Sequence, residues 1–128
     1  ELNYEDPLWG NTKKYVEASK NRWGSTPDYT EAASSASGLV FEAALRKINA
    51  KPPLSEQDRE NLVKALEEVS VMTFYGPVKF ASEGNWYHDN TGLVPLTIQI
   101  QDGVPVVVGP GSLKMAEPKY PAPGFKGR

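Results

Sequence analysis

The pattern of apolar residues changes at about residue 70, and this change limits the folds that the chain can adopt. Before it, apolar side chains recur at the three-to-four-residue spacing of amphipathic helices, and after it the pattern is that of strands. A run of helices followed by a run of strands offers no βαβ units, which build the parallel sheets that such helices usually cover. We therefore expect an α/β chain whose helices need a sheet encoded elsewhere.

Three helices are expected in the first part of the chain. The first covers residues 11–23 and ends at Gly24, because glycine commonly follows the last helical residue. The second covers residues 31–48, and its first half is almost entirely small residues, which would let a ligand or another backbone approach. Tight packing on a sheet is the simpler interpretation of that half. The third begins after Ser55, with Asp58 completing a capping box. Its apolar face is formed by Leu62, Val63, Leu66 and Val69.

Two strand pairs are expected after the helices. Residues 71–75 and 78–80 read as short strands that flank Gly76 and Pro77. Residues 96–101 alternate apolar and polar side chains, and Asp102-Gly103 separates them from the valine-rich residues 104–108. An Asp-Gly pair between two such runs is typical of a tight β-hairpin. Pro105 indicates an edge strand, because proline cannot donate a ladder hydrogen bond.

The composition excludes several classes of protein. A net charge of -2 gives no general attraction for nucleic acid or an anionic membrane. The absence of cysteine excludes disulfides, cysteine-based zinc sites and a cysteine nucleophile. No stretch approaches the ~20 apolar residues of a membrane span.

Catalytic motifs are also absent, and we expect neither enzymatic activity nor a cofactor nor a metal. The chain has no Gly-x-Ser-x-Gly elbow and no phosphate-binding glycine loop. His88 is the only histidine, and we expect it to be solvated in a polar turn rather than to serve as an acid-base group. Trp86 and Tyr87 could stack on a sugar or a base, although anchoring of the neighbouring strand is the simpler interpretation.

The segment from Pro27 to Glu31 is the best local candidate for ligand binding. It precedes a predicted helix N-terminus, where unpaired N–H groups and the helix dipole meet. Tyr29 offers a hydroxyl and an aromatic face, and the carboxylate of Glu31 suits an ammonium group. On local sequence alone, a capping loop in which Glu31 complements the helix dipole is the better explanation of the segment.

Several segments, in this order, resemble type 1 periplasmic binding proteins of the branched-chain amino acid and amide subfamily. The resemblance runs from about Tyr4 to about Pro110, and no single motif is diagnostic, whereas the ordered set is. The segments are 6–10, 15–16, 27–29, 36–45, 73–80 with Gly84, and 99–108.

The resemblance implies that the chain is part of a two-lobed α/β type 1 periplasmic-binding-protein fold. Residues 1–92 would be the second segment of the N-terminal lobe. Residues 93–109 would hold the third crossover, with a hinge near 91–95, and the β-hairpin of the C-terminal lobe. Residues 110–128 form a Pro/Gly-rich tail outside the resemblance. Two lobes need more than 128 residues, so we expect roughly the last third of such a protein, with the parent sheets largely upstream.

The resemblance also implies a function and a site. The chain would be the substrate-binding component of an ABC importer for amino acids of the branched-chain type or related small carboxylates or amides. Its site residues would be Tyr29, Thr30, Glu31 and Ala32. Ser35 stands where relatives often carry an aromatic residue, which implies altered packing or more room near the cleft floor. The implied location is periplasmic or extracellular, with a lipid anchor as one option.

The expected partners are an amino acid-like ligand and an ABC permease, without nucleic acid. The piece itself should self-associate or pair with the missing upstream part, because its apolar faces need cover. Two alternatives stay open. One is a ligand-sensing domain of the same fold that regulates a partner protein. The other is a stand-alone interaction module that uses the edge of the 96–108 hairpin for strand addition.

Overall fold

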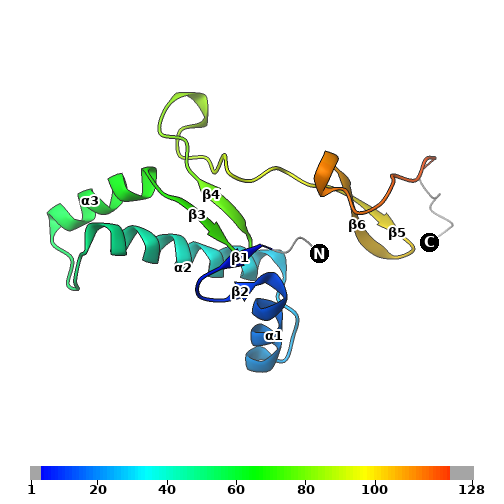
Figure 1. Cartoon of the computed structure of the whole chain (residues 1–128), viewed down its shortest axis with the longest axis horizontal. Helices are drawn as coiled ribbons and strands as arrows, with labels where there is room; N and C mark the ends of the chain where they lie inside the picture. Colours follow the sequence, from blue (N-terminus) through cyan, green and yellow to red (C-terminus); the bar gives the residue numbers. More distant parts are fainter. Residues whose placement is uncertain (1–3, 122–128) are drawn as a thin grey trace. The chain divides into compact units, whose positions relative to one another are not determined.

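The computed structural model describes residues 4–121, which form a mixed α/β structure (Figure 1). This part of the chain holds three α-helices and three antiparallel two-stranded sheets, and it divides into two compact units, Glu1–Leu93 and Val94–Arg128. The elements are β1 (Glu5–Asp6), β2 (Gly10–Asn11), α1 (Thr12–Trp23), α2 (Tyr29–Ile48), α3 (Glu56–Glu67), β3 (Ser70–Thr73), β4 (Gly76–Lys79), β5 (Thr97–Gln101) and β6 (Val104–Gly109), with short 3₁₀ turns η1 (Gly84–Trp86) and η2 (Gly111–Leu113). The expectation of an α/β chain is thus confirmed at this level.

The helix boundaries follow from local capping. Asn11 accepts a hydrogen bond from the Lys14 N–H at the start of α1, and Gly24 ends that helix in the left-handed conformation. At α3, the expected capping box is present, because Ser55 and Asp58 accept hydrogen bonds from each other's backbone N–H. α2 begins at Tyr29, two residues earlier than predicted, because Asp28 caps it.

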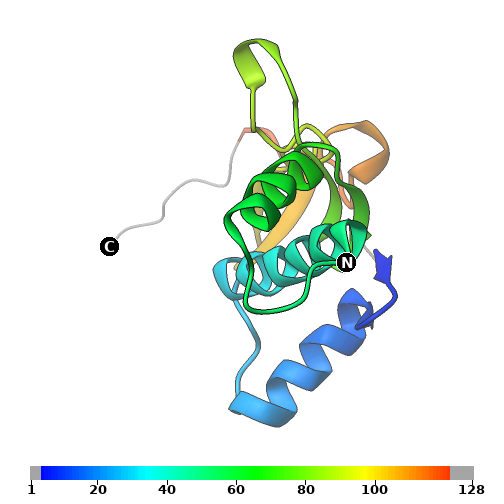
Figure 2. The same ribbon diagram turned by 90° about the vertical axis from the view of Figure 1, so that its left-hand side faces the viewer.

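α2 is the element on which the first unit is built. It lies beside α3 in two views and contacts β3 (Figures 1 and 2). The larger apolar cluster comes from α2, α3, β4 and the segment between α3 and β3, and it contains Val40, Ala44, Leu62, Ala65, Val69 and Val78. Leu62 and Val69 of the predicted apolar face are buried, and Leu66 packs against the cluster, whereas Val63 is exposed, contrary to expectation. Adjacent helix positions point in different directions, so Leu62 and Val63 cannot both face the core.

A second cluster of aromatic rings joins the N-terminal segment to the first hairpin. Tyr15 of α1 stacks on Phe74 with ring centroids 3.8 Å apart, and Trp9 meets Tyr15 edge to face at 5.5 Å. The buried carboxylate of Asp6 holds the same region together. Its Oδ1 accepts hydrogen bonds from the N–H groups of Leu8 and Trp9, and its Oδ2 accepts one from Phe74 at 2.7 Å.

The first hairpin turns at Phe74 and Tyr75, not at Gly76 and Pro77 as the flanking strands had indicated. Gly76 pairs with Thr73 and Pro77 pairs with Met72, so both residues belong to β4. The buried Thr73 hydroxyl explains the shift. It donates to the Gly76 carbonyl at 2.8 Å and accepts from the N–H groups of Tyr75 and Gly76.

The second unit is a hairpin that matches the prediction. Gln101 pairs with Val104, and Asp102 and Gly103 both have positive φ, as the tight turn requires. Pro105 lies in a two-stranded sheet, in which both strands are edges. The chain then returns towards the hairpin, because the N–H of Met115 donates to the Val107 carbonyl at 2.8 Å. Residues 122–128 of the expected tail lie outside the described residues.

Candidate functional site

The predicted ligand-binding segment forms the first turn of α2. The Glu31 N–H donates to Asp28 Oδ1 at 2.8 Å, and Glu31 Oε2 accepts a hydrogen bond from the Asp28 N–H at 2.9 Å. This is a capping box, which satisfies backbone groups that the helix itself cannot. The Glu31 carboxylate therefore already has a structural role, as the capping interpretation of this segment anticipated.

The other three predicted residues differ in their surroundings. Tyr29 is 78% exposed, so its hydroxyl and ring face outward, and Thr30 is also exposed. Ala32 is half-buried and packs against the aromatic cluster around Tyr15. The segment thus presents one aromatic ring, two hydroxyls and one carboxylate at the start of α2, and Ala32 faces the aromatic cluster.

Ser35 contacts the aromatic cluster through Tyr15. The Tyr15 hydroxyl donates to Ser35 Oγ at 2.9 Å and lies 3.4 Å from the Glu31 carbonyl oxygen. The phenol of Tyr15 in α1 therefore packs against Ser35 of α2. The expectation of altered packing or more room at Ser35 stays a prediction.

A cavity of about 360 Å³ lies one turn further along α2. Its walls include the small residues Ala33, Ala36 and Ser37 of α2. Across from them are Tyr75 and Phe80 of the first hairpin region, Asn90 and Leu93. The lining is mainly apolar with a few polar groups, which suits an apolar side chain of a ligand or of a covering element. None of the four predicted site residues lines it.

The opposite side of α2 has a second cavity of about 370 Å³. Leu39, Ala43 and Arg46 of α2 form one wall, and Leu8 and Met72 are among the residues of the other. α2 and the first hairpin thus leave open space on both sides. Large apolar side chains nearby stay exposed, including Leu8, Phe41 and Met72.

His88 lies in a polar turn with its side chain 55% exposed, as expected, and it also belongs to a polar cluster with Glu67 and Tyr87. The Tyr87 hydroxyl donates to Glu67 Oε1 at 2.6 Å, and His88 Nε2 lies 3.1 Å from the same oxygen. The two rings also stack at 3.7 Å. The hydrogen bond from Tyr87 and that with His88 lower the pKa of Glu67, and the same carboxylate raises the pKa of Tyr87.

This cluster anchors the segment after β4 to the end of α3. It borders a cavity of about 220 Å³ lined by Val63, Leu66 and Phe80 together with Glu67 and His88. The anchoring interpretation fits Tyr87, whereas Trp86 is 69% exposed.

Residues 4–121 bring together no group of three or more histidine, cysteine, aspartate or glutamate side chains able to hold a metal ion.

The expected crossover near residues 91–95 is anchored to β4 in its first part. Asn90 Oδ1 accepts hydrogen bonds from the N–H groups of Lys79 and Gly92, and the Thr91 N–H donates to the Lys79 carbonyl. A Cβ atom at Gly92 would lie 3.0 Å from the Pro77 carbonyl oxygen. The boundary between the compact units follows Leu93, and residues 94–96 have no regular structure.

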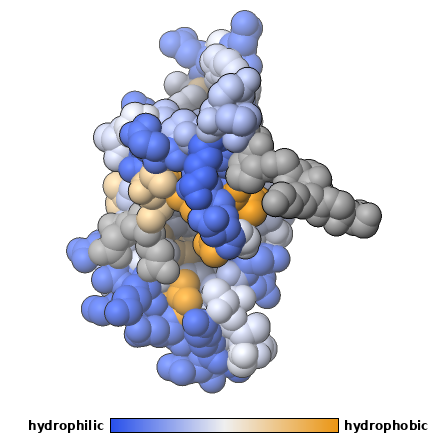
Figure 3. Space-filling model, turned by 90° about the vertical axis from the view of Figure 1, so that its right-hand side faces the viewer, coloured by the Kyte–Doolittle hydropathy of each residue, from blue (hydrophilic) through white to orange (hydrophobic). Residues whose placement is uncertain are grey.

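The second hairpin exposes apolar side chains on one of its faces. Ile98 and Ile100 point to the same side because strand residues alternate, and both are more than half exposed. Their cross-strand partners on this face are Val107 and Pro105, so the face carries no charge. Apolar residues reach the surface between hydrophilic ones in the space-filling view (Figure 3).

Sequence reasoning missed Asp6, Thr73, Gln99 and Gln101, whose side chains organise the backbone. Asp6 had a local signal, since aspartate often accepts hydrogen bonds from N–H groups two or three residues later. The contacts of Asp6 with Phe74 and of Gln101 with Glu117 join residues far apart in the chain, and no local pattern encodes them.

Comparison with known proteins assigns no family. No protein-family model matches the chain, and no solved structure gives a significant match. In residues 4–121, none of the helices combines the length and the apolarity needed to cross a bilayer.

Proposed function

We propose that this chain is part of an extracytoplasmic solute-binding protein that captures an amino acid or a related small carboxylate or amide for an ABC permease. The ordered set of segments that resembles the branched-chain amino acid and amide subfamily supports this proposal. The proposed function involves no catalysis, because the protein would bind and release its ligand without making or breaking a covalent bond.

The observation that carries the proposal is the incomplete cover of α2. The described part of the first unit, residues 4–93, has three helices but only pairs of antiparallel strands, and cavities of about 360 and 370 Å³ remain on the two sides of α2. Helices of an α/β lobe normally pack on a larger sheet. A parent sheet encoded upstream in the gene would supply this cover and most of the ligand contacts.

In this proposal the two compact units belong to different lobes, and the ligand binds as the lobes close. Tyr29, Thr30, Glu31 and Ala32 are the proposed contribution of this chain to the cleft. Ligand contacts with both lobes would shift the population towards the closed state. Residues 94–96 are the proposed flexible part of the crossover, because residues 90–92 are hydrogen-bonded to β4.

The experiment that tests the proposal is a thermal-shift screen of the intact gene product with amino acids, aromatic acids and small amides. A ligand present at about 100 times its Kd should stabilise the native state by ~2.7 kcal/mol. Stabilisation by one chemical class would support the proposal and identify the ligand. If no compound of these classes stabilises the protein, the proposed ligand class is wrong.

A matched pair of variants tests the role of Glu31. Glu31→Gln keeps a capping-box residue, because glutamine also fits this position, but it removes the negative charge. We expect about tenfold weaker binding of a ligand that carries an ammonium group, from the loss of a charge-assisted hydrogen bond of ~1.5 kcal/mol. Glu56→Gln in the first turn of α3 is the control and should leave the affinity unchanged. Equal affinities for Glu31→Gln and the parent protein would remove Glu31 from the site.

A stand-alone interaction module is the second candidate, and the exposed apolar face at Ile98 and Ile100 favours it. Such a module would bind a partner strand at a hairpin edge. Light scattering of the 128-residue chain separates the two candidates. Association is expected for a piece of a larger fold with uncovered apolar faces, whereas a cooperative monomer would favour the module.

A further inference from the structure

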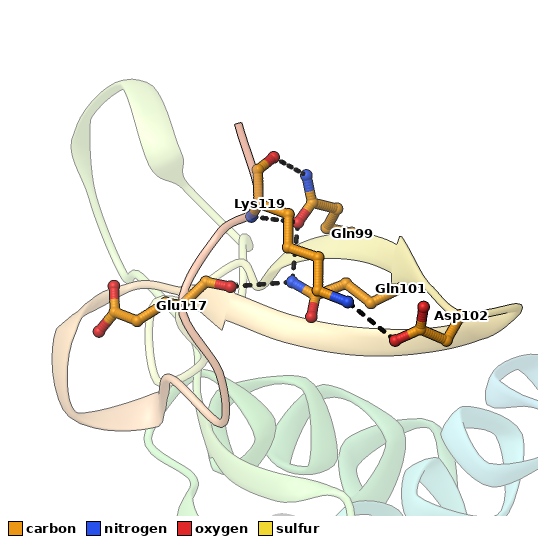
Figure 4. A network of polar contacts seen from close by, with 5 residues as sticks. All are labelled: Gln99, Gln101, Asp102, Glu117 and Lys119. Atoms are coloured by element: carbon orange, nitrogen blue, oxygen red, sulfur yellow. Dashed lines mark hydrogen bonds and ion pairs between the residues drawn. The ribbon is translucent and has the colours of Figure 1, made fainter. Parts of the chain in front are cut away.

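The side chain of Gln99 is paired with the backbone of Lys119 through two hydrogen bonds (Figure 4). Its Nε2 donates to the Lys119 carbonyl at 3.0 Å, and its Oε1 accepts from the Lys119 N–H at 2.9 Å. A carboxamide has the same donor and acceptor as a peptide group, so this pair reproduces one rung of a β ladder.

Gln101 adds a second rung two residues away. Its Nε2 donates to the Glu117 carbonyl at 2.9 Å and to Gln99 Oε1 at 2.8 Å (Figure 4). Residues 99 and 101 share one face of β5 because side chains of a strand alternate, and they contact residues 119 and 117, which have the same spacing. The bond between the two carboxamides orients each of them for its backbone partner.

These contacts go to main-chain atoms of the bound segment. The side chains of Glu117 and Lys119 are used elsewhere, since Glu117 pairs with Lys114 and Lys119 Nζ lies 2.8 Å from Asp102 Oδ2. Both ion pairs include an exposed carboxylate, so each contributes little. Gln101 is in contrast buried, with 7% of its surface exposed, and a buried carboxamide without partners would cost free energy.

We propose that Gln99 and Gln101 form a clasp for an extended peptide backbone, occupied in this chain by residues 117–119. The clasp recognises main-chain donors and acceptors and does not read the side chains of its occupant. It ties the segment after η2 to the hairpin of the second unit. The proposal is independent of solute binding by the complete protein.

The clasp makes a specific demand on its occupant. Position 119 must supply an N–H group, so proline is excluded there, whereas other side chains are accepted. Alanine at position 119 removes the ion pair with Asp102 but keeps both backbone partners of Gln99. Lys119→Ala is therefore the matched control for Gln99→Ala.

The test is amide hydrogen exchange of residue 119 in the full chain, measured by NMR. Gln99→Ala removes the acceptor of this amide, and we expect its exchange to accelerate about tenfold or more, which corresponds to the loss of ~1.4 kcal/mol of hydrogen bonding. Lys119→Ala should change the protection of this amide by less than about twofold, as expected for a weak exposed ion pair. Amides within β5 and β6 serve as the reference for an intact hairpin.

Two results would overturn the clasp. One is slow exchange of the residue 119 amide in Gln99→Ala. The other is an equal acceleration of this exchange in Lys119→Ala, which would mean that the ion pair with Asp102 holds the segment. A second variant, Lys119→Pro, leaves the hairpin sequence unchanged and should increase tryptic cleavage after Lys114 above that of Lys119→Ala. Equal cleavage of these two variants would also contradict recognition of the backbone.

Discussion

The two β-hairpins of this chain have the same number of strands but are held together in different ways. β3–β4 turns at Phe74 and Tyr75, lies against α2, and is fixed by Asp6 from a distant part of the chain. β5–β6 turns at Asp102 and Gly103, where local backbone conformation sets the register. The first hairpin thus depends on tertiary contacts, whereas the second depends on its turn.

This difference explains which hairpin the sequence described correctly. A short turn with two residues of positive φ requires Asp-Gly or a similar pair, so its sequence is nearly sufficient to locate it. The first hairpin has a Gly-Pro pair, which also resembles a turn, yet Gly76 has a packing role. An added Cβ atom at Gly76 would clash with Leu93, and the hydroxyl of Thr73 closes the turn two residues earlier than predicted.

The largest difference between the two hairpins is expected when Gly76 of the first and Gly103 of the second are each replaced by alanine. At Gly76, which has φ +134°, a Cβ atom would lie 2.5 Å from Leu93 Cδ2, and we expect Gly76→Ala to cost about 4 kcal/mol from backbone strain and overpacking. At Gly103, with φ +81° and no atom within 4 Å of the added Cβ, the cost should be about 1 kcal/mol. All three tryptophans lie in the first unit, so urea unfolding followed by fluorescence reports Gly76→Ala. Amide exchange in β5 and β6 reports Gly103→Ala, and equal costs would contradict the comparison.

Asp6→Asn should have the next largest effect, about 3 kcal/mol. The carboxylate accepts three backbone N–H groups, and an amide in its place would turn its NH₂ group towards at least one of them. The measurement is again urea unfolding by tryptophan fluorescence. Asp102→Asn is the control in the second hairpin, because asparagine also tolerates positive φ, and it should leave the fluorescence transition in place.

Thr73→Val should destabilise the first hairpin by about 2 kcal/mol. Valine has nearly the same shape but leaves the buried N–H groups of Tyr75 and Gly76 without the hydroxyl acceptor. Thr73→Ser keeps the hydroxyl and should recover most of the hydrogen-bonding loss in the same unfolding measurement. If serine and valine are equally destabilising, the hydroxyl does not close the turn.

The smallest effect is expected at Glu67, which holds the segment after β4 to α3. Hydrogen bonds from Tyr87 and with His88 lower the pKa of Glu67 below its ordinary value of 4.5. A lowered native pKa means that the stabilisation is complete above about pH 4.5 and is lost as the pH falls through the native value. The melting temperatures of the parent protein and Glu67→Gln should therefore differ at pH 7 and converge at acidic pH. A difference that persists at acidic pH would assign the effect to packing.

The candidate site shows the same division between local and distant information. The capping role of Ser55 could be read directly, because a cap and its partner lie within three residues. The placement of Tyr15 beside Ser35 could not, since it depends on how α1 packs against α2. The contact of His88 with Glu67 could not be read either, because the two residues are 21 positions apart.

The sequence by itself determined the helices, their caps and the Asp-Gly hairpin, since each depends on residues a few positions apart. Only the tertiary structure decided the aromatic cluster around Tyr15 and the partners of Asp6, Glu67 and Gln101. These contacts join segments of the chain that meet only after folding, so their energies leave no periodic trace in the sequence. Local rules act within a few residues, whereas packing selects among distant side chains by shape and by the need to pair buried polar groups.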